Sequence, residues 1–386
     1  MIDVIIVGAG PGGSTAARLL AQSGIQVMVF ERESFPRIKP CGGGLTSRAL
    51  KFLPDDYHQH LACEPTRWVF EGRDPHQFRA VSTATPYSHI VERQAFDEWL
   101  LSRAEAAGAT IHTQEAVTGI KAEGQGYRVL TTRGSYWTRY LIGADGGRGV
   151  TARLLGFSRP HNGAAMEVEV LVSPEVFETW KDSVNISIGK YPWGYAWVIP
   201  RRPILNLGVG SFRAHRLPLR RLLIDWVTLK LGHEASQHLN ILAHPLPYRL
   251  HSASLAKPRA VLVGDAAGMM DALSAEGIYS ALFSATLAAE TIREAAADDG
   301  SLLGYNQKLA QSLWPDLHAA TKVGLIFYPL PQFWTKLFLA NPSLIEQYLR
   351  VAQGKAPYSS LVAMGRRALL TKAHLYHGLN KGGPSL

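Results

Sequence analysis

The segment that most constrains the fold is a glycine-rich stretch near the N-terminus, Gly8-Ala9-Gly10-Pro11-Gly12-Gly13. A continuous apolar run of strand length precedes it over 2–7, and the apolar residues that follow it recur at helical spacing. A second apolar run, Val27 to Phe30, ends at Glu31. The pattern predicts a strand, a tight turn, a helix and a second strand, which together form a parallel βαβ unit.

This unit carries the signature of a dinucleotide site. Gly8, Gly10 and Gly13 fit G-x-G-x-x-G, whose glycines allow a tight turn and close approach of a pyrophosphate to the helix N-terminus. Glu31 follows at roughly the 20-residue spacing at which a carboxylate accepts hydrogen bonds from ribose hydroxyls. The alternative is a glycine turn that binds nothing. The sequence favours a bound dinucleotide and leaves its identity open.

The middle of the chain has a different character. From Ala165 to Phe212, short β-type segments separated by Pro, Gly, Asn and Asp predict an antiparallel sheet. A strand from Ala260 to Val263 and a helix from about Glu276 to Ala296 then resume the α/β alternation, and helices punctuated by prolines follow. We therefore expect an α/β protein with a Rossmann-like domain, an inserted antiparallel sheet and a helical C-terminal region.

Composition limits the compartment and the class of partner. The 386 residues allow two or three domains, and two cysteines are too few for a disulfide framework or a four-cysteine zinc site. We expect no metal site, because the histidines are scattered. The N-terminus has no signal-peptide pattern, so we expect a reducing, cytoplasmic location. A formal charge of +9 indicates anionic partners, such as phosphates, an acidic membrane surface or nucleic acid.

Two later segments are similar to the second and third motifs of FAD-dependent flavoprotein hydroxylases and reductases. The first, 141–146, holds Asp145 in an Ala-Asp-Gly turn, and the second, 263–268, holds Asp265 and continues through 274–278. The resemblance implies that Asp265 contacts the ribityl chain and that a helix beginning near 276–278 directs its N-terminus at the flavin. Arg93, in an R-x-x-[FL]-D segment, is similar to an arginine that lies over FAD. A helix cap for Asp265 and a surface position for Arg93 remain alternatives.

The chain offers no second dinucleotide motif. Gly208-Val209-Gly210 has Arg213 where the final glycine of such a motif would stand. We expect a nicotinamide to bind only transiently at the flavin, or electrons to arrive from a ferredoxin-type carrier. The external electron donor is therefore NAD(P)H or such a carrier.

Two segments select a subfamily. Lys39-Pro40-Cys41-Gly42-Gly43 and the stretch 192–200 are similar to K-P-C-G-G and P-x-x-Y-x-W-x-F-P, which are typical of the geranylgeranyl reductase family of FAD-dependent oxidoreductases. Ile199 stands where the family has Phe. The resemblance implies saturation of carbon–carbon double bonds in an isoprenoid lipid or quinone side chain, with Tyr195 and Trp197 holding the chain over the flavin. Because thiols are mostly protonated at neutral pH, Cys41 is a candidate proton donor.

The resemblance assigns the predicted site. The predicted catalytic residues are Cys41, Tyr195 and Trp197. The predicted FAD-binding residues are Gly8, Gly10, Gly12, Gly13, Glu31, Arg32, Cys41, Gly42, Gly43, Arg93, Asp145, Gly264, Asp265, Glu276, Gly277 and Ile278. Aromatic packing for Tyr195 and Trp197, and an inert core position for Cys41, are the alternatives.

The same residues bound the domains that we expect. The discontinuous FAD-binding domain comprises 1–60, 90–160 and 253–300, the substrate-binding sheet 61–89 and 161–252, and the helical region 301–386.

Two other functions stay open at this stage. A flavin-dependent monooxygenase or halogenase would act on an aromatic substrate, although Tyr195 matches the halogenase W-x-W-x-I-P pattern only in part. An electron-transfer flavoprotein would have no organic substrate of its own. Gly44-Leu45-Thr46 differs from the A-I-P continuation of the chlorophyll branch and favours lipid or quinone substrates.

Basic side chains recur beside apolar ones in two places. They are Arg216, Arg220 and Arg221, and further along Arg366, Arg367 and Lys372. These groups are either solvated helix faces or sites of contact with a membrane surface or a phosphate headgroup. We expect a prenyl-lipid partner, peripheral contact with the inner face of a membrane, and no nucleic acid.

Overall fold

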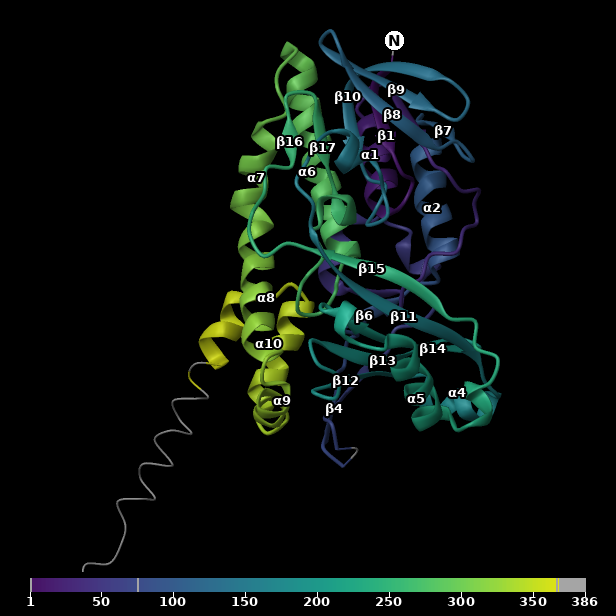
Figure 1. Cartoon of the computed structure of the whole chain (residues 1–386), viewed down its shortest axis with the longest axis vertical. Helices are drawn as coiled ribbons and strands as arrows, with labels where there is room; N and C mark the ends of the chain where they lie inside the picture. Colours follow the sequence, from purple (N-terminus) through teal and green to yellow (C-terminus); the bar gives the residue numbers. More distant parts are fainter. Residues whose placement is uncertain (1, 75, 366, 368–386) are drawn as a thin grey trace, which may run out of the picture.

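Two β-sheets organise the chain in a computed structural model that describes residues 2–74, 76–365 and 367 (Figure 1). The first sheet has the order β16-β17-β10-β1-β2-β7, with β8 and β9 continuing from β10. Its central strands β17, β10, β1, β2 and β7 run parallel, as the βαβ pattern predicts. Its strands are β1 (Ile2–Val7), β2 (Val27–Phe30), β7 (Thr110–His112), β8 (Val117–Glu123), β9 (Gly126–Thr131), β10 (Ser135–Gly143), β16 (Ala256–Lys257) and β17 (Ala260–Leu262).

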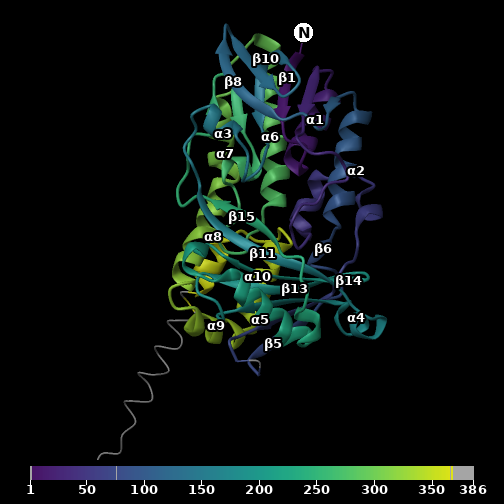
Figure 2. The ribbon, with the colours of Figure 1, turned by 45° about the vertical axis from the view of Figure 1, so that its right-hand side comes forward.

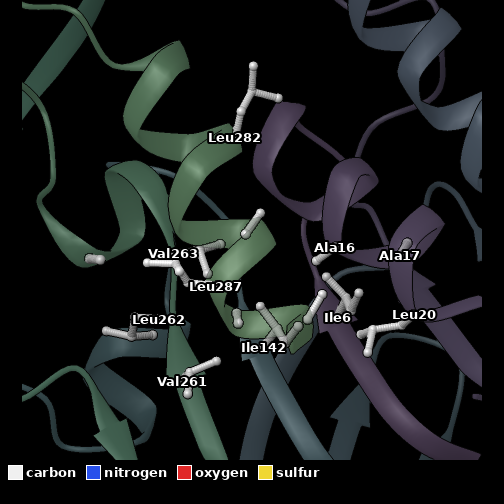
Figure 3. Close-up of a cluster of buried hydrophobic side chains, with 14 of the residues drawn as sticks. Ile6, Ala16, Ala17, Leu20, Ile142, Val261, Leu262, Val263, Leu282 and Leu287 are labelled. Carbon is white, nitrogen blue, oxygen red and sulfur yellow. The ribbon is translucent and has the colours of Figure 1, made fainter. Parts of the chain in front are cut away.

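Two helices pack side by side against this sheet. α1 (Pro11–Ala21) begins with proline, which suits the first helical position, and α6 (Ile278–Asp298) runs beside it. Small residues of α1 and branched residues of the strands and α6 form the buried cluster between them (Figure 3). Its labelled members are Ile6, Ala16, Ala17, Leu20, Ile142, Val261, Leu262, Val263, Leu282 and Leu287. This packing fixes the N-termini of both helices at the carboxyl ends of the parallel strands.

Helix α6 begins at Ile278 and ends at Asp298, each within two residues of the predicted bounds. The loop before it sets this start, because Asp271 accepts hydrogen bonds from the N–H groups of Leu273 and Ser274 and holds the chain in a turn. Ala275 then adopts a φ of 57°, a left-handed conformation that does not fit into a right-handed helix.

The second sheet has the order β15-β11-β14-β13-β12-β4-β5. Its pairs are antiparallel, as predicted for the segments of 165–212, except for β12 and β4, which are parallel. The reason is that β4 enters from a distant part of the chain instead of through a hairpin. Its strands are β4 (Arg67–Glu71), β5 (Phe78–Ser82), β11 (His161–Leu171), β12 (Ser183–Ile188), β13 (Gly194–Arg201), β14 (Ile204–Ser211) and β15 (Leu242–Tyr248).

Successive side chains along each strand of the second sheet point to its two opposite faces. Ala196 and Val198 of β13 face α5 (Leu219–Leu231), which lies on the side away from the first sheet (Figure 2). Tyr195, Trp197 and Ile199 alternate with them and face the first sheet. The space between the sheets is therefore lined by every second residue of this strand.

The remaining elements close the ends of the molecule. Helices α8, α9 and α10 lie together beside the second sheet (Figures 1 and 2). The elements not yet named are α2 (Arg93–Ala106), α3 (Thr151–Leu154), α4 (Pro174–Trp180), α7 (Gly304–Ser312), α8 (Trp314–Phe327), α9 (Pro331–Leu339), α10 (Pro342–Ala352), the short pair β3 (Gly44–Thr46) and β6 (Ser88–Ile90), and the 3-10 turns η1 (Ser47–Phe52), η2 (Tyr57–His60), η3 (Ala214–Arg216), η4 (Glu234–Ser236) and η5 (Gly264–Ala267).

Among the described residues, no helix is long and apolar enough to cross a bilayer. The domain boundaries given above remain a prediction. Of the predicted basic groups, Arg366 and Lys372 lie outside the described residues.

A close contact inside the second sheet gives a first testable expectation. A Cβ at Gly208 would lie 1.9 Å from Cζ2 of Trp197, so this ring lies directly over the glycine. We expect Gly208→Ala to lower the unfolding free energy by about 1–3 kcal/mol, since the ring must move out of a packed sheet. Gly210→Ala is the matched control, because its nearest neighbour would be Ala165 Cβ at 3.5 Å. Denaturant unfolding measures both; equal stability of the two variants would contradict the expectation.

Candidate active site

One continuous cavity of ≈ 920 Å³ runs between the two sheets. At one end it is lined by the glycine-rich loop, and at the other by apolar side chains of the second sheet and of α8, α9 and α10. Ligand pockets usually measure about 300–1,000 Å³, so this volume lies near the upper end of the range. The cavity has a polar half and an apolar half, and the Cys41 loop lies where they meet.

The glycine-rich loop forms the polar end. Gly8 has a φ of 101°, and a Cβ there would lie 2.5 Å from the carbonyl oxygen of Ala144. A Cβ at Gly13 would lie 1.9 Å from the carbonyl oxygen of Gly8. Gly10 and Gly12 line the cavity, and no side chain caps the first turn of α1. The first-turn N–H groups therefore remain available for a phosphate.

Glu31 lies at the end of β2 and holds the glycine-rich loop in place through hydrogen bonds. Its two carboxylate oxygens accept the N–H of Ala9 at 2.9 Å and that of Glu33 at 3.1 Å. A carboxylate has about four acceptor positions, so capacity remains for ribose hydroxyls. Arg32 also lines the cavity, but its side chain is 56% exposed and pairs with Glu33.

The loop containing Cys41 is fixed from both sides. The N–H of Cys41 donates to Glu167 Oε1 at 2.7 Å, and its sulfur accepts the N–H of Gly43 at 3.4 Å. A Cβ at Gly42 would lie 2.7 Å from Ile199 Cδ1, so this backbone approaches β13 closely. Cys41 thus faces the cavity from a loop that has little freedom to move.

Arg93 is buried behind this loop at the start of α2. It makes a bidentate ion pair with Asp97, with both distances 2.8 Å, and also interacts with the Cys41 thiol. Asp97 is fully buried and also binds Arg37 at 3.0 Å. The surface alternative for Arg93 is therefore wrong, and its contact with FAD stays a prediction.

A charged cluster lies beside the third motif. Lys39 Nζ is 3.1 Å from His244 Nδ1, and His244 Nε2 is 3.7 Å from Asp265 Oδ2. Burial, and then the charge of Arg93, lower the pKa of Lys39 to about 8. For Asp265, burial opposes ionisation, but His244, Lys39 and Arg93 together lower the pKa. Asp265 is therefore a carboxylate at neutral pH.

Asp145 lines the cavity from the end of β10. One of its oxygens accepts three hydrogen bonds, from the N–H of Val150 and from the N–H and hydroxyl of Thr151. The other oxygen is buried and has no partner among the described residues. Burial raises the pKa of Asp145, although these hydrogen bonds counteract it. This unpartnered oxygen of Asp145 is suited to accept a hydrogen bond from a donor group of a bound ligand.

Glu276 is held in place rather than free. It binds Thr46 and Arg48, and Arg48 also pairs with Asp316 of α8 at 3.0 Å. Gly264, Gly277 and Ile278 line the cavity next to it, at the start of α6. This ion-pair group connects the predicted flavin helix to the C-terminal helices.

The two predicted aromatic residues have fixed partners. The hydroxyl of Tyr195 donates to the carbonyl of Ser274 at 2.6 Å, and burial raises its pKa well above the ordinary value. The indole N–H of Trp197 donates to Asn206 Oδ1 at 2.7 Å. Both side chains pack in the sheet and also line the cavity, so the packing and pocket interpretations hold together.

Sequence reasoning missed three groups. Glu167 and Asn206 are polar residues within otherwise apolar strands, and that interruption was the available signal. The apolar stretch from Val323 matches no motif, yet it lines the cavity. The cavity-lining side chains of this region are Val323, Ile326, Phe327, Tyr328, Trp334, Leu337, Phe338, Leu344, Tyr348, Tyr358, Leu361 and Val362.

Comparisons with known proteins agree with this geometry. A family model described as FAD binding domain matches residues 1–207. The chain is 30% identical over 345 residues to a menaquinone reductase of Mycolicibacterium smegmatis, covering 82% of this chain and 80% of the relative. It is 28% identical over 384 residues to digeranylgeranylglycerophospholipid reductase 1 of Methanopyrus kandleri, covering 91% and 97%.

Solved structures share the fold. A geranylgeranyl bacteriochlorophyll reductase-like protein of Thermoplasma acidophilum superimposes with a TM-score of 0.79 at 23% identity, covering 95% of this chain and 98% of that one. The flavin-dependent brominase Bmp2 gives 0.71 at 19% identity, covering 97% and 99%. At these identities the likeness concerns the fold alone. The family match, together with the open glycine cradle, shows that the cofactor is FAD.

Proposed function

Because the chain belongs to the geranylgeranyl reductase family of FAD-dependent oxidoreductases, we propose that it saturates carbon–carbon double bonds of an isoprenoid lipid or quinone side chain. The relatives are named for menaquinone and for a digeranylgeranyl phospholipid, and both names indicate a long prenyl chain. The domain boundaries and site residues predicted above form part of this proposal.

The observation that carries the proposal is the continuity of the cavity. Its polar end suits FAD, and its other end is a long apolar space with aromatic walls. An unconjugated alkene offers a protein no polar handle, so binding must come from apolar surface and shape. Tyr195 and Trp197 lie at the junction, where they would position one double bond.

The protein's own residues would orient the chain and supply a proton. Reduced FAD, when bound, supplies the hydride. Cys41 faces the cavity at the junction and would donate the proton to the other alkene carbon. The apolar walls exclude water, so the proton must come from a positioned group. Arg93 and Gly43 hold the sulfur of Cys41 in place.

Halogenation or oxygenation of an aromatic substrate finds less support. A lysine in the substrate tunnel would favour a halogenase. Among the described residues that line the cavity, Lys39 is the single lysine, and it contacts His244 in the polar half. An electron-transfer flavoprotein without an organic substrate would not need the long apolar half of the cavity.

The electron donor and any membrane contact belong to the proposal as well. The cavity residues supply no second dinucleotide loop, because Gly208 and Gly210 lie within β14. NAD(P)H would therefore approach the flavin from outside, or a ferredoxin-type carrier would deliver electrons. Exposed Leu325, Ile326, Leu330 and Phe333 lie near the apolar end of the cavity and suit a peripheral membrane position.

The test is anaerobic reduction with defined substrates. Purified protein is reduced with dithionite and mixed with menaquinone, a digeranylgeranyl phospholipid or geranylgeranyl diphosphate, and the products are analysed by mass spectrometry. We expect a product heavier by two hydrogens for each double bond reduced. Absence of saturated product with all three, from protein that binds FAD, would overturn the proposal. Oxygen-dependent chlorination of an aromatic compound would support the halogenase instead.

A further inference from the structure

A second, smaller pocket lies directly behind Cys41. Its volume is ≈ 100 Å³, which has room for about three waters at roughly 30 Å³ each. Its walls are about half polar, and the polar part includes Lys39, Arg93, Glu169, Arg201 and Asn240. Glu169 and Asn240 are exposed, so the pocket reaches solvent. A polar space of this kind is suited to hold water next to an otherwise apolar cavity.

Glu167 is one of five residues that line both this pocket and the main cavity, together with Ile38, Lys39, Pro40 and Arg93. It is only 4% exposed, and its Oε1 accepts the N–H of Cys41 at 2.7 Å. Nearby Arg201 is also buried, and its Nε has no hydrogen-bond partner among the described residues. A buried donor without a partner is costly unless water reaches it. Glu167 is thus a buried carboxyl placed between solvent-connected space and the loop that carries Cys41.

Burial raises the pKa of Glu167, although the Cys41 N–H, Arg201 and Asn206 counteract it. Charged or titratable groups face this carboxyl from every neighbouring element. They are Glu169 on its own strand, Arg201 on β13, His244 on the paired strand β15, Glu92 and Arg93 at the start of α2, and Lys39 and Cys41 on the loop. A raised pKa favours the protonated form of this carboxyl, which is the form that a proton donor requires.

From this placement we propose that Glu167 is a proton-relay residue, which restores the proton that Cys41 gives up and is itself reprotonated through the side pocket. The inference rests on the proposed function. Each double bond gains one hydride, as the flavin is oxidised, and one proton from the Cys41 thiol. The thiolate then takes a proton from the Glu167 carboxyl, and the carboxylate is reprotonated by a proton from bulk solvent that side-pocket water conducts, so that one solvent proton is consumed for each double bond.

The test separates the first turnover from later ones. In Glu167→Gln, the amide oxygen can still accept the Cys41 N–H, but the side chain cannot carry a proton. We expect the first double bond to be reduced at the wild-type rate, because the first proton does not pass through Glu167, and the steady-state rate to fall about 10- to 100-fold, within the range of proton-transfer catalysis. Glu167→Asp should restore part of the steady-state rate.

The pH dependence gives a second measure. The relay needs the protonated carboxyl, so the wild-type steady-state rate should fall as pH rises through the pKa of Glu167. Glu167→Gln should lack this decline. Infrared spectra of the resting FAD-loaded protein provide a readout without turnover, because the protonated-carboxyl band should titrate in wild type and be missing in Glu167→Gln.

The matched control is Glu71→Gln. Glu71 is a half-buried carboxylate of the same sheet that binds Lys230 at 2.6 Å and lines neither space. An unchanged steady-state rate in Glu167→Gln, or an infrared titration that persists in it, would overturn the relay. Wild-type protein that saturates no substrate would instead overturn the proposed function.

Discussion

Replacing Cys41 by alanine should lower the rate of the first double-bond reduction by about 10²–10⁴-fold, the usual contribution of a general acid. The thiol lines the cavity where its polar and apolar halves meet, and the apolar walls leave few other donors within reach. FAD binding should persist, because the loop is held by backbone hydrogen bonds to Glu167 and Val91 that alanine keeps. Anaerobic stopped-flow, following flavin absorbance, measures this step.

Cys63→Ala is the matched control for this experiment. The sulfur of Cys63 donates to the carbonyl of Pro200 at 3.1 Å, and burial raises its pKa to about 12. It does not line the cavity, so its loss should change the reduction rate less than about twofold and affect stability instead. If Cys41→Ala reduced the alkene at the wild-type rate, Cys41 would be a packing residue and another group would donate the proton.

The second large effect is expected for Gly13→Ala. The new Cβ would lie 1.9 Å from the carbonyl oxygen of Gly8 and 3.0 Å from its carbonyl carbon, and both are backbone atoms that cannot turn aside. The loop must then open, which displaces the N–H groups of the first turn of α1. We expect a loss of at least about 3 kcal/mol, equal to roughly a 100-fold rise in the Kd for FAD.

Titration of apo-protein with FAD, followed by flavin fluorescence, measures the Kd. Gly304→Ala is the control, since a Cβ at this position of α7 would have no neighbour within 4 Å. Its Kd should match that of wild type. Tight FAD binding by Gly13→Ala would show that the cofactor does not depend on the tight turn seen here.

Much of the flavin end of the site could be predicted from local sequence. The βαβ unit, the glycine loop and Glu31 lie within one short stretch, so their geometry depends on near neighbours and on the parallel register. Asp145 and Asp265 follow strands whose carboxyl ends meet at one edge of the sheet. The order of the strands alone implies that Asp145 and Asp265 lie next to each other on that edge.

The contacts of Glu276, just before α6, show what local reasoning could not reach. Helical spacing is already present at Glu276, but Asp271 and Ala275 hold the preceding turn, and Arg48 binds Glu276 from a segment far away in the chain. Spacing cannot reveal an ion pair between residues so distant. The parallel pairing of β12 with β4 was missed for the same reason.

The sequence alone determined the cofactor class, the βαβ unit and the family resemblance, and it singled out Cys41 as a candidate, because short motifs encode contacts between near neighbours. Only the tertiary structure decided that α8, α9 and α10 form the walls of the cavity, and that Glu167 lies between Cys41 and a solvent-connected pocket. These relations join residues more than 100 positions apart, such as Cys41 and Glu167. They arise only because packing of the two sheets brings distant strands and loops into contact. The spacing of residues along the chain does not reveal such contacts.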